Sequence, residues 1–291
     1  MMQENAYLKQ AQSGQNEFWR YLVVNVGIIG VSLAVSVVLV IIAFFVEGTL
    51  DYRQFSPITM LLVAMLPFPF ALAGLWAGLR FLHGRPLRSL ITPWKRVNWK
   101  RLFFSAAGWF VLSGLVDVVL AFMQPGNYVF SFDWRRSLPY FVLAFLLIPV
   151  QTSTEELLFR GYLPQSLSLL TKGIWLPLIV PALVFGFLHG TNPEVGMYGM
   201  ALMLPTYVLM GLMLGWITLR SQSLELALGL HWANNLYAGV VVTFQGSSLT
   251  SPAIFSIQQF DPLAATIGLL LSMGVYLLGA YWLGGLKPSQ A

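Results

Sequence analysis

The stretch PYFVLAFLLIPVQTSTEELLFRGYL, residues 139–163, places two adjacent carboxylates, Glu155 and Glu156, in an otherwise apolar sequence. Arg160 follows four residues after the second carboxylate. A charged side chain at the centre of a bilayer costs about 2.5–3.5 kcal/mol on insertion scales, so acids in a membrane span indicate a functional site. The stretch therefore predicts a membrane-embedded fold with a reactive centre inside it.

The rest of the chain has the composition of a polytopic membrane protein. Of its 291 residues, 57% are hydrophobic and 9% are charged, whereas roughly a quarter of residues are charged in soluble domains. Apolar runs of about 17–25 residues correspond to transmembrane helices. We expect an all-α bundle of about eight such helices, at residues 21–46, 56–82, 102–123, 139–159, 174–190, 197–219, 224–245 and 263–286.

The polar segments between these runs are too short for a second folded domain. We expect one transmembrane helical domain, residues 21–286, after a cytoplasmic segment, residues 1–20. The first apolar run follows a mixed-charge segment without a small-residue cleavage pattern, so we expect a retained span. The chain contains no cysteine, which excludes disulfides, thiolate metal ligands and a cysteine nucleophile.

The distribution of lysine and arginine predicts the orientation. With a cytoplasmic N-terminus, only Arg53, Arg135 and Arg136 of the 16 basic residues fall outside. Cytoplasmic loops of membrane proteins carry an excess of lysine and arginine. We therefore expect a multi-pass protein of the bacterial plasma membrane with both termini in the cytoplasm. Anionic lipid accounts for the net charge of +5, and no nucleic acid partner is expected.

Helical geometry separates the two carboxylates. Adjacent residues of a helix point about 100° apart, so Glu155 and Glu156 face different directions. Glu156 and Arg160, at positions i and i+4, share one face and can form an ion pair. We expect Glu156 to pair with Arg160 and Glu155 to project into the bundle as a free carboxylate. The alternative is that both acids serve a salt bridge at the membrane edge.

Two of the three histidines lie in similarly apolar surroundings. His189 ends the run PALVFGFLHG, four residues after Phe185, and His231 precedes Asn235 by four residues in LELALGLHWANNLYAGV. Taken singly, each fits core packing or an interhelical hydrogen bond. Together with Glu155, the two imidazoles and the amide form a hydrolytic set that can activate water and stabilise an oxyanion.

The residues leave two assignments open. Glu155, His189 and His231 could hold zinc with one open coordination position, although asparagine is a poor zinc ligand and the chain has no HExxH motif. Zinc is thus compatible with the sequence and not required by it. Asp117, an acid in the third apolar run, could line the site or pair with a neighbouring helix.

Three motifs occur in order within residues 139–245 and resemble the EExxxR, FxxxH and HxxxN patterns of the CPBP family. This family of intramembrane proteases comprises CAAX proteases, Abi proteins and bacteriocin-processing enzymes. The motifs read Glu155-Glu156-Leu-Leu-Phe-Arg160, Phe185-Gly-Phe-Leu-His189 and His231-Trp-Ala-Asn-Asn235.

The resemblance implies an intramembrane endopeptidase. Glu155 and His189 would activate water, and His231 and Asn235 would hold the oxyanion. The residues with supporting roles would be Glu156, Arg160 and Phe185. The expected partners are a peptide or protein substrate, lipidated in the eukaryotic relatives, and membrane lipid. Family members are described both as metalloproteases and as metal-free enzymes, and we favour the metal-free mechanism.

Two functions from other classes use the same polar residues. A non-catalytic membrane adaptor or bacteriocin self-immunity protein would use them to fix helix packing, and a proton-coupled carrier would use them to bind protons. The linear geometry also opposes the resemblance at one point. If the spans begin near Pro139 and Trp175, a rise of 1.5 Å per residue places Glu155 near the cytoplasmic edge and His189 well toward the outside.

Overall fold

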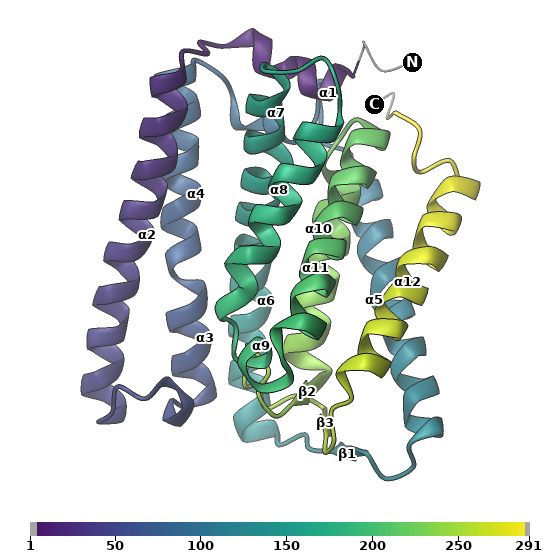
Figure 1. Ribbon diagram of the computed structural model, residues 1–291. Helices are drawn as coiled ribbons and strands as arrows, with labels where there is room; N and C mark the ends of the chain where they lie inside the picture. The colour runs from purple at the N-terminus through teal and green to yellow at the C-terminus, as the bar shows by residue number, and fades with distance from the viewer. Residues whose placement is uncertain (1–4, 289–291) are drawn as a thin grey trace.

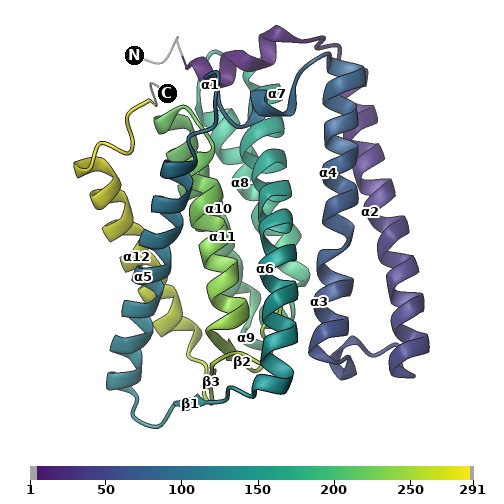
Figure 2. The ribbon, with the colours of Figure 1, turned by 180° about the vertical axis from the view of Figure 1, so that it is seen from behind.

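The long apolar runs form helices that lie side by side in the computed structural model, which describes residues 5–288 (Figures 1 and 2). Within the described residues, six helical segments are long and apolar enough to cross a membrane: Phe18–Glu47, Pro57–His83, Trp99–Met123, Trp134–Ser168, Met200–Ser221 and Pro262–Trp282. Two shorter helical segments, Trp175–Thr191 and Glu225–Val240, occupy the remaining predicted runs. The expected all-α transmembrane bundle of about eight helices is confirmed.

The spanning segments divide into labelled helices as follows: α2 (Phe18–Glu47), α3 (Pro57–Met65), α4 (Pro67–Ala77), α5 (Trp99–Met123), α6 (Trp134–Glu156), α7 (Leu163–Ser168), α10 (Met200–Ser221) and α12 (Pro262–Trp282). The shorter ones are α1 (Ala6–Lys9), α8 (Trp175–Leu188), α9 (Pro193–Tyr198) and α11 (Glu225–Val240). Side-chain caps define several starts. Asp133 accepts a hydrogen bond from a backbone N–H of the first turn of α6, and Asp261 accepts two from α12.

The helix that carries the two carboxylates is longer than expected. The predicted span 139–159 is wrong, because one continuous helical segment runs over Trp134–Ser168. It passes through a π-helical stretch, Leu157–Tyr162, and Pro164 follows directly in α7. Proline lacks the N–H that would serve the carbonyl four residues earlier, and here the Arg160 carbonyl accepts the Tyr7 hydroxyl at 3.0 Å. Glu155 therefore lies well inside a long helix.

A small sheet closes one end of the bundle (Figure 1). Its strands are β1 (Tyr128–Phe130), β2 (Val242–Phe244) and β3 (Phe255–Ile257), in the order β1-β3-β2. Strand β3 pairs antiparallel with β1 and parallel with β2. The predicted span 224–245 is thus too long, since α11 ends at Val240 and the β-branched and aromatic residues that follow form β2.

The other end of the bundle holds α1 and the C-terminal end of α12 (Figures 1 and 2). Of the N-terminal segment predicted at residues 1–20, residues 1–4 lie outside the described part. Its remainder forms α1 and a 3₁₀ turn, Gln10–Ser13, before α2 begins at Phe18. Tyr7 of α1 is fully buried, so this segment is packed on the bundle.

Helix α11 is the most enclosed element of the fold. It packs against α5, α6 and α10, and most of its side chains are buried. Gly229 permits the close approach to α5, because a Cβ at this position would collide with the Leu102 carbonyl oxygen. The helix that carries His231 and Asn235 is therefore surrounded by other helices, in contrast to α2, whose described side chains are largely exposed.

Candidate active site

Glu156 joins two helices at the centre of the site. Its side chain is 0% exposed, and Oε1 accepts hydrogen bonds from Arg160 Nη1 and His231 Nδ1, both at 2.7 Å. The expected i,i+4 pair with Arg160 is present in the structure. The bond to His231, which links α6 to α11, was not anticipated from the sequence. Glu156 thus contacts both a permanent cation and one of the candidate catalytic imidazoles.

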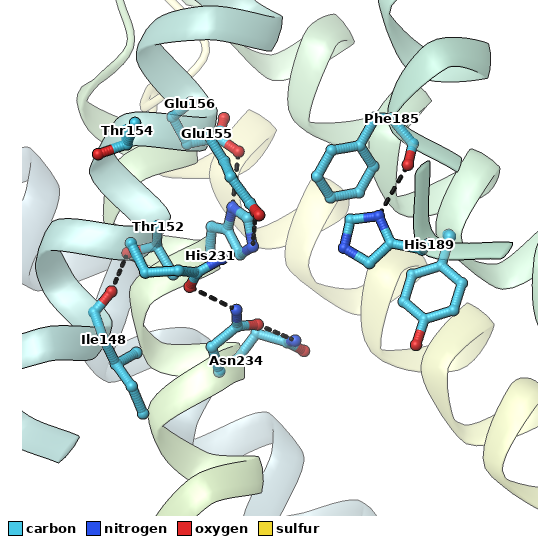
Figure 3. A network of polar contacts seen from close by, with 12 residues as sticks. Ile148, Thr152, Thr154, Glu155, Glu156, Phe185, His189, His231 and Asn234 are labelled. Atoms are coloured by element: carbon cyan, nitrogen blue, oxygen red, sulfur yellow. Dashed lines mark hydrogen bonds and ion pairs between the residues drawn. The ribbon is translucent and has the colours of Figure 1, made fainter. Parts of the chain in front are cut away.

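The partners of His231 define its tautomer. An ionised carboxylate only accepts hydrogen bonds, so Nδ1 carries the proton that is donated to Glu156. The opposite nitrogen, Nε2, lies 3.6 Å from Glu155 Oε2, a distance too long for a direct hydrogen bond. Figure 3 shows His231 held between the two carboxylates. The neutral imidazole consequently presents the Nε2 lone pair toward Glu155.

His189 is oriented by its own helix end. Its Nδ1 lies 2.7 Å from the carbonyl oxygen of Phe185, one turn earlier. A carbonyl only accepts, so Nδ1 is the donor and Nε2 carries the lone pair when the ring is neutral. The ring also stacks on Tyr207, with centroids 4.5 Å apart. His189 is therefore held from two sides with a defined tautomer.

Phe185 lies among the charged and imidazole groups (Figure 3). Its ring centroid is 4.3 Å from that of His189 and 5.9 Å from that of His231. The guanidinium carbon of Arg160 lies 4.1 Å from the same ring, which is within cation–π range. Phe185 thus contacts both histidines and the arginine that neutralises Glu156.

Asn235 belongs to a directed chain of hydrogen bonds that runs from Trp109 to Gln151. The Trp109 indole N–H donates to Asn234 Oδ1, Asn234 Nδ2 donates to Asn235 Oδ1, and Asn235 Nδ2 donates to Gln151 Oε1, each at 3.1 Å. An indole nitrogen can only donate, so it fixes the orientation of both amides. Asn235 retains one further N–H for another acceptor.

The four candidate catalytic side chains line one cavity of about 590 Å³. Glu155, His189, His231 and Asn235 all contribute to its wall. The linear depth expectation, which kept Glu155 and His189 apart, is therefore wrong. Glu155 lies in the interior of the 35-residue segment Trp134–Ser168. Helix α8, with 14 residues, ends at Leu188, directly before His189, and does not reach the level of the sheet (Figure 1).

Further polar residues of the cavity were missed in the sequence. Gln151 precedes Glu155 by four residues, so its shared helix face was a usable signal. Glu194 lies in the short helix α9 and is 5% exposed. Its carboxylate accepts hydrogen bonds from Ser248 at 2.6 Å and from Tyr207. Such contacts between loop segments and α10 leave no periodic pattern in the sequence.

Asp117 belongs to a different place in the bundle. Its carboxylate accepts hydrogen bonds from Tyr128 at 2.8 Å and Tyr237 at 2.7 Å. It lines an adjoining cavity of about 180 Å³, which shares Asn234 with the wall of the larger cavity. Of the two expectations for this acid, pairing with neighbouring segments is the one that the structure shows.

Comparison with known proteins identifies the family. The family model for type II CAAX prenyl endopeptidase Rce1-like proteins matches residues 134–237, the segment that contains all three motifs. The uncharacterized protein YyaK of Bacillus subtilis (strain 168) is 30% identical over 270 residues, which cover 89% of each chain. The chain belongs to the Rce1-like family. This Rce1-like protein is an integral membrane protein, and its family supports an intramembrane protease role. No solved structure matches the chain.

The zinc set considered for this Rce1-like protein does not fit a metal ion as its side chains lie. Among residues 5–288, no three histidine, aspartate or glutamate side chains are grouped to bind one ion. The ring of Phe185 contacts both histidines.

Proposed function

We propose that the chain is an intramembrane endopeptidase that hydrolyses peptide bonds of membrane-associated or hydrophobic substrates. One observation carries the proposal: Glu155 Oε2 lies 3.6 Å from His231 Nε2, in a cavity that His189 and Asn235 also line. A buried base, an oriented imidazole and a directed amide together suit the addition of water to a carbonyl group.

Glu155 is the group that activates water. Its Oε2 atom is buried and has no hydrogen-bond partner among the described residues. The carboxylate accepts a proton from water as the water oxygen attacks the carbonyl carbon of the scissile bond. His189, on the same cavity wall, presents the Nε2 lone pair as a second acceptor that holds this water.

Asn235 and His231 stabilise the oxyanion that develops on the carbonyl oxygen. Asn235 donates its second amide N–H. In the doubly protonated form of His231, Nε2 is a second donor to the oxyanion, while Nδ1 stays bonded to Glu156. The proton taken up by Glu155 then passes to the leaving nitrogen as the C–N bond breaks. The products are a carboxylate and an amine.

The decisive experiment for this function is peptide cleavage by the purified protein. Wild-type protein in detergent, incubated with a library of hydrophobic peptides, should produce new amino termini that mass spectrometry identifies. His231→Ala should produce none of them while it keeps the wild-type elution profile and helical content. Equal cleavage by wild type and variant would reject the proposed site, and a wild-type protein without cleavage would favour the non-catalytic adaptor or self-immunity protein.

The hydrogen-bond chain to Asn235 gives a graded prediction. We expect Asn235→Leu to lower kcat by about 10²–10³-fold, the usual cost of one oxyanion donor. Trp109→Phe should lower kcat by a smaller factor with little change in KM. Without the indole N–H, the side-chain amides of Asn234 and Asn235 are free to flip. A Trp109→Phe enzyme with wild-type kcat would show that the chain does not position Asn235.

We also propose that the protein lies in a bacterial plasma membrane with both termini in the cytoplasm. Both described ends of the chain lie at the same end of the bundle (Figure 1). The proposed partners are peptide or protein substrates, including lipidated ones, and membrane lipid.

A further inference from the structure

The basic residues are divided unequally between the two ends of the bundle. Arg53, Arg135 and Arg136 belong to segments at the sheet end, and Arg160 is paired with Glu156 inside. The others belong to the end that holds α1: Lys9, Arg20, Arg80, Arg85, Arg88, Lys95, Arg96, Lys100, Arg101, Lys172, Arg220 and Lys287. An excess of this size assigns the α1 end to the cytoplasm.

The catalytic cavity extends toward the opposite end. From Glu155 and His231 it continues along residues of α9, of the loop after β2 and of the start of α12, including Glu194, Leu249 and Pro262. These elements surround the sheet end of the bundle (Figures 1 and 2). Among the described residues, none of the cavity wall comes from α1, α7 or the loop 84–98.

The α1 end is closed by a buried layer of hydrogen bonds. Tyr7 is fully buried, and its hydroxyl lies 2.6 Å from the Leu90 carbonyl and 3.0 Å from the Arg160 carbonyl. Gln165 Nε2 donates to the carbonyls of Tyr7 and Ser89 at 3.1 and 2.9 Å. A substrate from the cytoplasm would have to break this layer to reach Glu155.

The charge of the cavity also opposes a cytoplasmic CAAX tail. Such a tail ends in a free carboxylate a few residues from the scissile bond. In residues 5–288 the cavity wall contains the carboxylates Glu155 and Glu194 and no lysine or arginine. A terminal carboxylate would therefore be desolvated next to two acids without a cationic partner, which is unfavourable.

We propose that the site is entered from the extracytoplasmic side and cleaves peptide segments of exported or membrane proteins that are exposed there. This inference rests on the proposed endopeptidase function. The cavity, with its methionine and phenylalanine walls around a few polar groups, suits an apolar peptide segment, and the closed α1 end separates it from cytoplasmic proteins.

Topology is tested with single cysteines, because the chain contains none of its own. Thr250→Cys is exposed beside the cavity loop, Leu249→Cys lines the cavity, and Gln12→Cys is exposed at the α1 end. A membrane-impermeant maleimide should label Thr250→Cys and Leu249→Cys in spheroplasts and Gln12→Cys only in inverted vesicles. The reverse pattern, or labelling of Leu249→Cys only in inverted vesicles, would overturn the proposal.

Substrate class is tested by comparing protein amino termini in cells that produce the wild type or Glu155→Gln. Termini that depend on the wild type should map to extracytoplasmic segments; their location in cytoplasmic proteins would overturn the inference. Cysteine labelling reports the topology of the protein whether or not the protein is active. The cleavage assay in detergent reports activity whichever side of the membrane the cavity faces, because both ends of the bundle are accessible in detergent. The experiments therefore distinguish a wrong assignment of the entry side from a wrong assignment of the endopeptidase function.

Discussion

Replacement of Glu155 by glutamine is expected to lower kcat for peptide cleavage by about 10²–10⁴-fold, the range of a general base. The amide has nearly the shape of the carboxylate and keeps a polar group beside His231, but it cannot take up the proton of the attacking water. Folding should be unaffected, because the Oε2 atom of Glu155 has no hydrogen-bond partner among residues 5–288. Steady-state kinetics with a cleaved library peptide, together with thermal unfolding, measures both effects.

Glu17→Gln is the matched control for this substitution. Glu17 is exposed at the α1 end and pairs with Arg20 on the surface at 2.6 Å, and surface pairs contribute about 0–1 kcal/mol. The Glu17→Gln variant should cleave the peptide at the wild-type rate. A Glu155→Gln protein that also cleaves at that rate would show that Glu155 is not the base.

The sequence predicted an all-α transmembrane bundle and the approximate number of its helical segments, but not the ends of the helix that carries Glu155 and Glu156. Apolar run length fixes the number of spans, because the bilayer sets it. The predicted span 139–159 stops short of Pro164, yet the helical segment continues past this residue. The acceptor left free by Pro164 is served by Tyr7, a contact between residues far apart in the chain. No local pattern predicts it.

In the site, too, contacts within one helix could be predicted from the sequence, whereas contacts between helices could not. Relations within one helix, such as Glu156 with Arg160, follow from spacing alone. Contacts between helices, such as Glu156 with His231 and His189 with Tyr207, depend on how the helices are placed in depth. The family resemblance supplied the convergence of Glu155 and His189 that linear geometry denied. It did not supply Glu194, which lies outside its motifs.

Arg160→Met is expected to lower the free energy of unfolding by about 3–5 kcal/mol, the usual cost of removing one partner of a buried ion pair. Arg160 and Glu156 are 1% and 0% exposed, so water cannot replace the guanidinium. The variant also loses the cation–π contact with Phe185. Reversible unfolding in mixed micelles measures the change, and the exposed Arg136→Met serves as the control with little expected effect.

The double variant Glu156→Met and Arg160→Met separates stability from catalysis. Two apolar side chains of similar volume in place of a buried ion pair are often neutral or stabilising, so most of the lost stability should return. The double variant should not cleave peptides, because His231 Nδ1 has lost the acceptor that orients its ring. A double variant as unstable as Arg160→Met would show that the unpaired carboxylate is not the cause of the instability. A double variant that cleaves normally would show that Glu156 does not orient His231. Because one oxygen of Glu156 accepts from both groups, the arginine makes burial of the acid tolerable and the acid in turn fixes the imidazole.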